Sequence, residues 1–197
     1  MDVFEAMGTA RAMRWYREDP VPDELIERVL WAATRAGSPG NNQCWDFVVV
    51  TDAEQRRRLG EAVEPFAQVA ARASEPDDPT ARRTLHGARH LAGSLADVPV
   101  IVVVCGHNVY PAHHPMEHMM WSAVYAASQN LIVAARALGL GAAFTTFHAT
   151  APAEFKRILS IPEDRHLGVT IPLGWPAGPE GPVSRRPLEE VVHRDRW

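Results

Sequence analysis

Lysine is nearly absent from the chain, and cysteine is scarce. Lys156 is the only lysine among 20 lysine and arginine residues. It lies in a charged helical stretch, which makes Schiff-base chemistry at an activated lysine a poor hypothesis. Cys44 and Cys105 are too few for a disulfide framework and form no CxxC motif, so they indicate free thiols in a reducing compartment. Because arginine carries almost all the positive charge, an arginine alone does not indicate a phosphate site.

Long apolar runs are also missing. No stretch reaches the length needed to cross a bilayer, and the N-terminal residues MDVFEAMGTARAMRW lack the apolar run of a signal peptide. We therefore expect a cytoplasmic protein with no membrane partner. The formal net charge of −4 gives no general attraction for nucleic acid. The 197 residues, 46% of them hydrophobic, predict a single domain over residues 1–197 whose last part, about 176–197, is an extended arm.

Hydrophobic periodicity predicts helices that alternate with strands. The apolar run at 100–106 is the clearest buried strand, and the alanine-rich stretch 117–138, which Gly139 ends, is the longest helix. Thr51 and Glu54 have the spacing of a capping box, and residues 65–80 indicate an irregular excursion between helices. Further helices are expected over 22–36 and 80–96 and from Thr150, and further strands over 45–50, 142–147 and 167–173.

Two motifs that could suggest a dinucleotide or a metal have plainer interpretations. GLGAAF at 139–144 follows a helix and leads into a strand, which is the reverse of a dinucleotide-binding turn, so it indicates a helix end. His107, His113, His114 and His118 crowd one loop, but Pro115 disfavours the helical geometry that a shared metal would need. We therefore expect no metal site.

Three polar segments together suggest one anionic ligand. Arg11 and Arg14 share a face if their short stretch is helical, and Arg185 and Arg186 stand together in the arm. The loop 38–43, SPGNNQ, supplies hydroxyl, amide and backbone donors between a helix and a strand. Buried polar groups need partners, and one ligand rich in acceptors could satisfy all three segments. A solvated surface is the alternative for each arginine pair.

The same segments resemble landmarks of the FMN-dependent nitroreductase family. RAMRWY at 11–16 looks like its early arginine-arginine-serine-x-arginine-x-aromatic motif. GSPGNNQCW at 37–45 looks like its proline-serine-x-x-asparagine-x-glutamine-proline-tryptophan motif. The helix that contains Gln129–Asn130 and ends in GLGA is similar too, as are PLGWP at 172–176 and RRPLEEVV at 185–192. The four landmarks occur in order over nearly the whole chain.

The resemblance implies a fold of the α+β class, a three-layer α/β/α sandwich with a mixed, mainly antiparallel sheet. It further implies a homodimer that exchanges its C-terminal arms and holds FMN at each subunit junction. The implied activity is that of an oxidoreductase in which NAD(P)H reduces FMN by hydride transfer to N5. A nitroaromatic, quinone or other conjugated acceptor would then take the electrons in the same pocket, which is a ping-pong mechanism.

The resemblance also assigns roles to residues. Arg11 and Arg185 would hold the FMN phosphate, with Arg186 as a helper, and Arg14 would face the N1–O2 edge of the ring and tune it. No catalytic acid or base is expected from the protein, because the flavin N5 carries the chemistry. The complete expected cofactor-binding set is Arg11, Ala12, Met13, Arg14, Ser38, Pro39, Asn41, Gln43, Thr146, Phe147, Arg185 and Arg186, the backbone amides near Thr146 and Phe147 reaching toward N5.

Three departures from the family pattern qualify these roles. Ala12 stands where the family has serine, and Gly37 and Cys44 stand where it has proline, so one hydrogen bond to the phosphate or ribityl chain is expected to be missing, worth about 1 kcal/mol. Two other functions fit the same fold: an FMN-sequestering protein without turnover, and a related flavin enzyme that removes halide or fragments flavin. Trp15 and the 107–120 loop are candidates for the substrate side.

Overall fold

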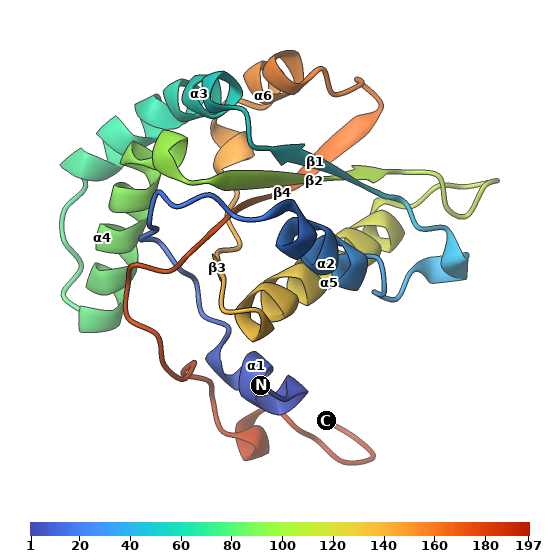
Figure 1. The fold of residues 1–197 in the computed structure, drawn as a ribbon. Helices are drawn as coiled ribbons and strands as arrows, with labels where there is room; N and C mark the ends of the chain where they lie inside the picture. Colours follow the sequence, from blue (N-terminus) through green and yellow to red (C-terminus); the bar gives the residue numbers. More distant parts are fainter.

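A four-stranded antiparallel sheet forms the middle layer of the computed structural model, which describes residues 1–197 (Figure 1). The strand order is β1-β2-β4-β3. Val48 lies opposite Val103, and Val103 lies opposite Thr170 in the next strand, so β2 is central. The strands are β1 (Trp45–Val50), β2 (Val100–His107), β3 (Gly141–Ala142) and β4 (Arg165–Gly174).

Side chains of β2 alternate between two hydrophobic cores, one on each face of the sheet. Val102 and Val104 pack into one core, and Ile101 and Val103 pack into the other. This double burial explains why β2 is apolar at successive positions rather than at every second one. The strand expected at 100–106 and the expected three-layer architecture are both confirmed.

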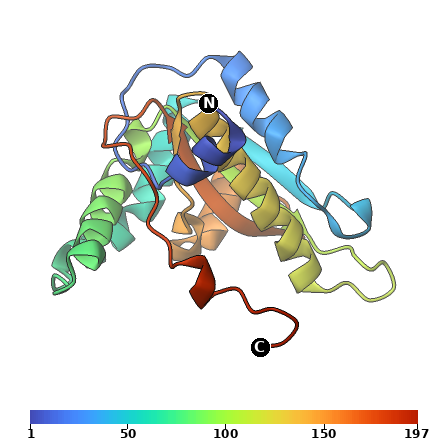
Figure 2. The ribbon, with the colours of Figure 1, turned by 90° about the horizontal axis from the view of Figure 1, so that it is seen from below.

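The helices form the two outer layers (Figures 1 and 2). One core holds side chains of α2 and α5, and the other holds those of α3, α4 and α6. No helix combines the length and apolar character needed for a membrane span. The helices are α1 (Val3–Thr9), α2 (Asp23–Ala33), α3 (Ala53–Arg72), α4 (Pro79–Gly93), α5 (Glu117–Ala137) and α6 (Pro152–Leu159), with short 3-10 helices η1 (Pro39–Asn41), η2 (Leu95–Asp97), η3 (Phe147–Thr150) and η4 (Leu188–Glu190).

The long helix α5 lies across one face of the sheet. Ala127 and Leu131 are fully buried in its middle, which agrees with the small polar face seen in the sequence. Gly139, at φ +79°, ends the helix in a conformation that suits glycine. This geometry confirms that GLGAAF marks a helix end.

Helix α3 differs from the sequence expectation at both ends. Its N-cap is Asp52, whose carboxylate accepts a hydrogen bond from the Gln55 amide at 2.9 Å. The prediction of a capping box formed by Thr51 and Glu54 is therefore wrong. The helix also continues through Pro65 to Arg72, so the irregular segment begins later than residue 65. Leu59 and Val63, both fully buried, show that tertiary packing outweighs the hydrogen bond that Pro65 cannot donate.

The strand expected at 142–147 is mostly wrong. Pairing in β3 ends at Ala142; beyond it the Ala143 amide donates to the Pro172 carbonyl at 3.4 Å and Thr145 forms a bridge to Thr170. The Thr145 hydroxyl donates to the Thr170 carbonyl at 2.6 Å, and the chain then turns into η3. A parallel bridge between Ala12 and Ala142 adds the mixed character to an otherwise antiparallel sheet.

The C-terminal arm begins by running along its own chain. The Ala177 amide donates to the Trp15 carbonyl and the Val183 amide donates to the Gly8 carbonyl, each at 2.9 Å. Residues 185–197 are exposed, and the arm ends well away from the sheet (Figure 2). Exchange of the arm between two copies stays a prediction, and it concerns this last part.

Replacing Pro65 by alanine tests the continuous α3. Pro65→Ala restores a backbone donor inside the helix, so we expect the free energy of unfolding to rise by about 1–3 kcal/mol. Urea denaturation at fixed protein concentration measures the change. Pro79→Ala is the matched control, because Pro79 lies in the first turn of α4, where proline is tolerated. Equal effects of the two substitutions would contradict a helix that continues through residue 65.

Candidate functional site

A cavity of about 1030 Å³ opens between three segments that are far apart in the sequence. One wall is residues 10–15, the second is the beginning of α4 with the loop before it, and the third is the arm from Ala177 to Arg185. The backbone bonds from the arm to residues 8 and 15 hold the first and third walls together. Arg11, Ala12, Met13, Arg14 and Arg185, which the sequence predicted for one site, all line this cavity.

The cavity carries positive charge that the chain does not neutralise. Arg11, Arg14 and Arg185 line it, and no ion pair joins any of them to a carboxylate. Glu75 is the only acidic residue of the lining, and it lies 3.6 Å from both Arg82 and Arg89. Several unpaired guanidinium groups around one cavity favour an anionic ligand.

Arg14 is the most enclosed of these cations. Burial lowers the pKa of its guanidinium, the nearby Tyr16 opposes this shift, and the positive charge of Arg11 adds to it. Its side chain crosses α4 at Gly87, where an added Cβ would lie 2.5 Å from Arg14 Cδ. The missing side chain at Gly87 therefore provides the space for Arg14.

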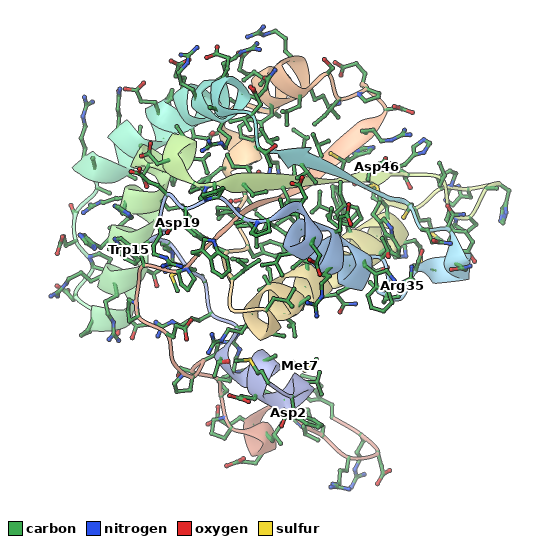
Figure 3. All side chains as sticks on the ribbon, viewed as in Figure 1. Asp2, Met7, Trp15, Asp19, Arg35 and Asp46 are labelled. Carbon is green, nitrogen blue, oxygen red and sulfur yellow. The ribbon has the colours of Figure 1, made fainter.

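Trp15 fixes the same wall against α4. Its ring stacks on His90 at 5.1 Å between centroids and 14° between planes, and Figure 3 shows it beside that helix. A Cβ at Gly87 would also lie 3.2 Å from Trp15 Cη2. Trp15 thus lines the cavity but is held against the protein.

Tyr16 anchors the backbone of the arginine segment. Its hydroxyl lies 2.7 Å from the Met13 carbonyl and 3.2 Å from the Pro172 carbonyl, and burial raises the pKa of Tyr16, so it stays a donor. The Met13 amide donates to the Ala142 carbonyl at 2.9 Å. The sequence motif contained this tyrosine only as an aromatic position, and its anchoring role was missed.

Thr146 and Phe147 lie outside the cavity lining and directly follow the segment that runs along β4. Ala142 pairs with Leu173 and Thr145 with Thr170, which places them about 10 Å apart along the strand. The backbone amides of Thr146 and Phe147 donate no hydrogen bond within the chain. His148 supports this turn, because its Nδ1 lies 3.0 Å from the Thr170 hydroxyl; burial lowers its pKa.

The loop 38–43 lies at the opposite end of α5. Near the end of that helix, Arg136 binds Thr9 and Glu180 beside the cavity, whereas Tyr110, just before its start, contacts Gly40. The 21 residues of α5 span roughly 30 Å. Figure 3 shows Trp15 beside α4 on one side of the molecule and Arg35, which precedes the loop, on the other side. Within one chain, therefore, the structure does not bring Ser38, Pro39, Asn41 or Gln43 to the arginines; Arg186 also lies outside the lining.

The loop is nevertheless built to present polar groups. Ser38 Oγ accepts a hydrogen bond from the Gln43 amide at 2.7 Å, which folds the loop back on itself. Asn41 and Gln43 both have φ of +51°, a conformation that costs free energy for residues other than glycine. Asn41, Asn42 and Gln43 are exposed, so a second molecule can reach this loop.

The histidines of the 107–120 loop are not grouped with one another in the structure. His107 Nε2 lies 3.4 Å from Asp164, and no three His, Cys, Asp or Glu side chains in the structure are grouped so that they could hold an ion. His113, His114 and His118 are exposed.

Comparisons with known proteins agree with this geometry. A family model described as the Nitroreductase family matches residues 9–175. A protein of Methanothermobacter thermautotrophicus, provisionally named NADH dehydrogenase/NAD(P)H nitroreductase, is 30% identical over 203 residues, covering 100% of this chain and 88% of the relative. The 5,6-dimethylbenzimidazole synthase of Rhodospirillum rubrum is 33% identical over 198 residues, covering 93% of this chain and 90% of the relative.

A solved structure shares the fold. A nitroreductase with bound FMN from Desulfitobacterium hafniense has a TM-score of 0.75 at 20% identity, covering 99% of this chain and 100% of that one. The expected nitroreductase-like sandwich is thereby confirmed.

Adding one methyl group at Gly87 tests the wall between Arg14 and α4. Gly87→Ala forces Arg14 and Trp15 to move, so we expect the free energy of unfolding to fall by about 1–3 kcal/mol and the Trp15 fluorescence to change. Gly93→Ala in the same helix meets nothing within 4 Å, and it should leave stability unchanged or raise it by up to about 1 kcal/mol. A Gly87→Ala protein as stable as Gly93→Ala would show that Arg14 does not lie there.

Proposed function

Because the chain belongs to the nitroreductase family, we propose that it is an oxidoreductase that binds FMN and passes electrons from NAD(P)H to a small conjugated acceptor such as a nitroaromatic or a quinone. The observation that carries the proposal is the cavity of about 1030 Å³ in which Arg11, Arg14 and Arg185 lack carboxylate partners. FMN has a phosphate dianion at one end and an electron-accepting ring at the other, and this donor set suits both.

Arg11 and Arg185 would hold the phosphate. They come from two adjoining walls of the cavity, residues 10–15 and the arm, so both guanidinium groups could bind the same phosphate. Guanidinium groups pair with phosphate oxygens through two parallel hydrogen bonds each. Ala12 offers no hydroxyl here, which leaves its backbone as the only polar contribution from that position.

Arg14 would lie near the ring, with the amides of Thr146 and Phe147. When bound, FMN supplies a centre that accepts a hydride from a nicotinamide and returns two electrons to an acceptor. A half-buried, unpaired Arg14 favours negative charge beside it, and it would therefore favour the reduced state of the cofactor. Because β4 sets Thr145 about 10 Å from Ala142, the two amides would lie toward the end of the ligand remote from the phosphate.

A second copy of the chain would complete the site. The loop 38–43 lies roughly 30 Å from the arginines along α5, which is longer than FMN. A homodimer that sets the loop of one copy against the arginines of the other would let Ser38, Asn41 and Gln43 bind the ribityl chain and ring. The exposed ends of the arms beyond Arg185, residues 186–197, are free to cross between copies.

The donor and the acceptor would use one pocket in turn, a ping-pong mechanism. The cavity is larger than a phosphate and a ribityl chain require, so the side toward α4 is open to a second ligand. The protein then binds, orients and shields the reactants, and it needs no acid or base of its own.

The similarity to a 5,6-dimethylbenzimidazole synthase at 33% identity favours a second candidate, fragmentation of the flavin itself. Product analysis distinguishes the two. Steady oxidation of NADH or NADPH with a quinone or nitroaromatic, with intact FMN recovered, supports the reductase. Loss of FMN with release of a benzimidazole supports the synthase, and tight FMN with neither reaction would leave only sequestration.

Removing the two phosphate arginines tests the cofactor site. Arg11→Ala and Arg185→Ala should each weaken FMN binding about 10- to 100-fold, because each loses a charge-assisted contact worth about 1.5–3 kcal/mol. Titration of the apoprotein, followed by flavin fluorescence, measures the affinity. Arg28→Ala, an exposed residue of α2, is the control and should bind FMN normally. Unchanged affinity in both test variants would mean that the phosphate lies elsewhere.

A further inference from the structure

One face of α4 presents polar donors to the cavity beyond the residues assigned to FMN. Thr80, Arg83 and Thr84 line the cavity, and with Gly87 they follow the spacing i, i+3, i+4, i+7 that places side chains on one side of a helix. Gly87 packs against Arg14 and Trp15, so this face adjoins the place proposed for the flavin ring.

Arg83 has no partner within the chain. Its neighbour Arg82 lies 3.6 Å from Glu75 and donates to the carbonyls of Pro76 and Asp77, each at 3.2 Å. Arg89, about two turns further along α4, donates to the carbonyls of Ala70 and Ala73, each at 2.6 Å. Arg83 makes no such hydrogen bond or ion pair, although it lies between these two arginines in the sequence.

The positive charge of the cavity exceeds what FMN needs. Arg11 and Arg185 match the two charges of a phosphate, and Arg14 matches the charge that a reduced ring gains. Arg82 is already paired with Glu75, the only acidic residue of the lining. The charge of Arg83 is therefore not needed for binding FMN. Arg83 lies on the open side of the cavity, where a second ligand would enter.

We propose that Arg83, with the hydroxyls of Thr80 and Thr84, forms a subsite for an oxyanion, a phosphate or carboxylate, carried by the second ligand of this pocket. The inference rests on the proposed function. A guanidinium flanked by two hydroxyl donors suits the oxygens of either group. The oxyanion has two possible sources, a phosphate of the nicotinamide donor or an acidic group on the acceptor, and both ligands use the same cavity.

Matched charged and neutral substrates test the subsite in the FMN-bound protein. The donors are NADPH, NADH and the uncharged N-benzyl-1,4-dihydronicotinamide, and the acceptors are 4-nitrobenzoate and 4-nitrobenzamide. Arg83→Gln should raise KM about tenfold for the charged donors, for 4-nitrobenzoate, or for both. A tenfold change is what the loss of one charge-assisted contact would cause. The neutral pair should be unaffected, and Arg83→Lys should restore most of the loss.

Two controls isolate the effect. Arg82→Gln changes a neighbouring charge that is already paired, so it should not change the ratio of charged to neutral KM. FMN affinity, measured by fluorescence, should be unchanged in Arg83→Gln, because Arg83 is not assigned to the cofactor.

The outcomes separate the subsite from the function. An effect on the donors alone assigns the oxyanion to the donor phosphate, and an effect on 4-nitrobenzoate alone assigns it to the acceptor; either supports the subsite. Equal KM changes for charged and neutral ligands, or none, would overturn it while the enzyme remains active. A wild-type protein that binds FMN but turns over none of these pairs would refute the proposed function and the subsite together.

Discussion

Uncompensated positive charge in one cavity is the constraint on which the rest of this site depends. Arg11, Arg14 and Arg185 face the same space without a carboxylate partner, and Arg14 is partly desolvated as well. Holding such cations together costs free energy, and an anionic ligand would recover it. The surrounding structure maintains this arrangement: Tyr16 and the Met13 amide fix the arginine segment on the sheet, and the first half of the arm is hydrogen-bonded to that segment.

The length of α5 gives the second constraint. The helix separates the arginine cavity from the loop 38–43 by roughly 30 Å, and both ends carry polar groups that the chain itself leaves available. One chain cannot bring these two sets of groups together, and the proposed homodimer would. The same helix is apolar on most of its surface, which suits burial against a second copy of the chain. This property agrees with a site that needs two copies.

Much of the fold could be predicted from the sequence, because β2 and α5 have unambiguous periodicity and Gly139 marks a helix end. The sequence could not show that α3 continues through Pro65, since burial of Leu59 and Val63 against distant segments decides it. The two arginine pairs could be predicted to form a site only when they were considered together and in the light of the family resemblance. The close packing of Gly87 and the proposed role of Arg83 could not be found at all, because α4 meets residues 11–15 only in the folded chain, some seventy positions apart in the sequence.

The FMN content of a mixed dimer measures most directly whether two copies share one site. One copy would carry Arg11→Ala with Arg185→Ala, and the other Asn41→Ala with Gln43→Ala, each with its own purification tag. Neither variant alone should retain FMN. The mixed dimer has one junction in which all four residues are intact, so it should retain one FMN per two chains. A mixed dimer as empty as its two parents would contradict a site shared between copies.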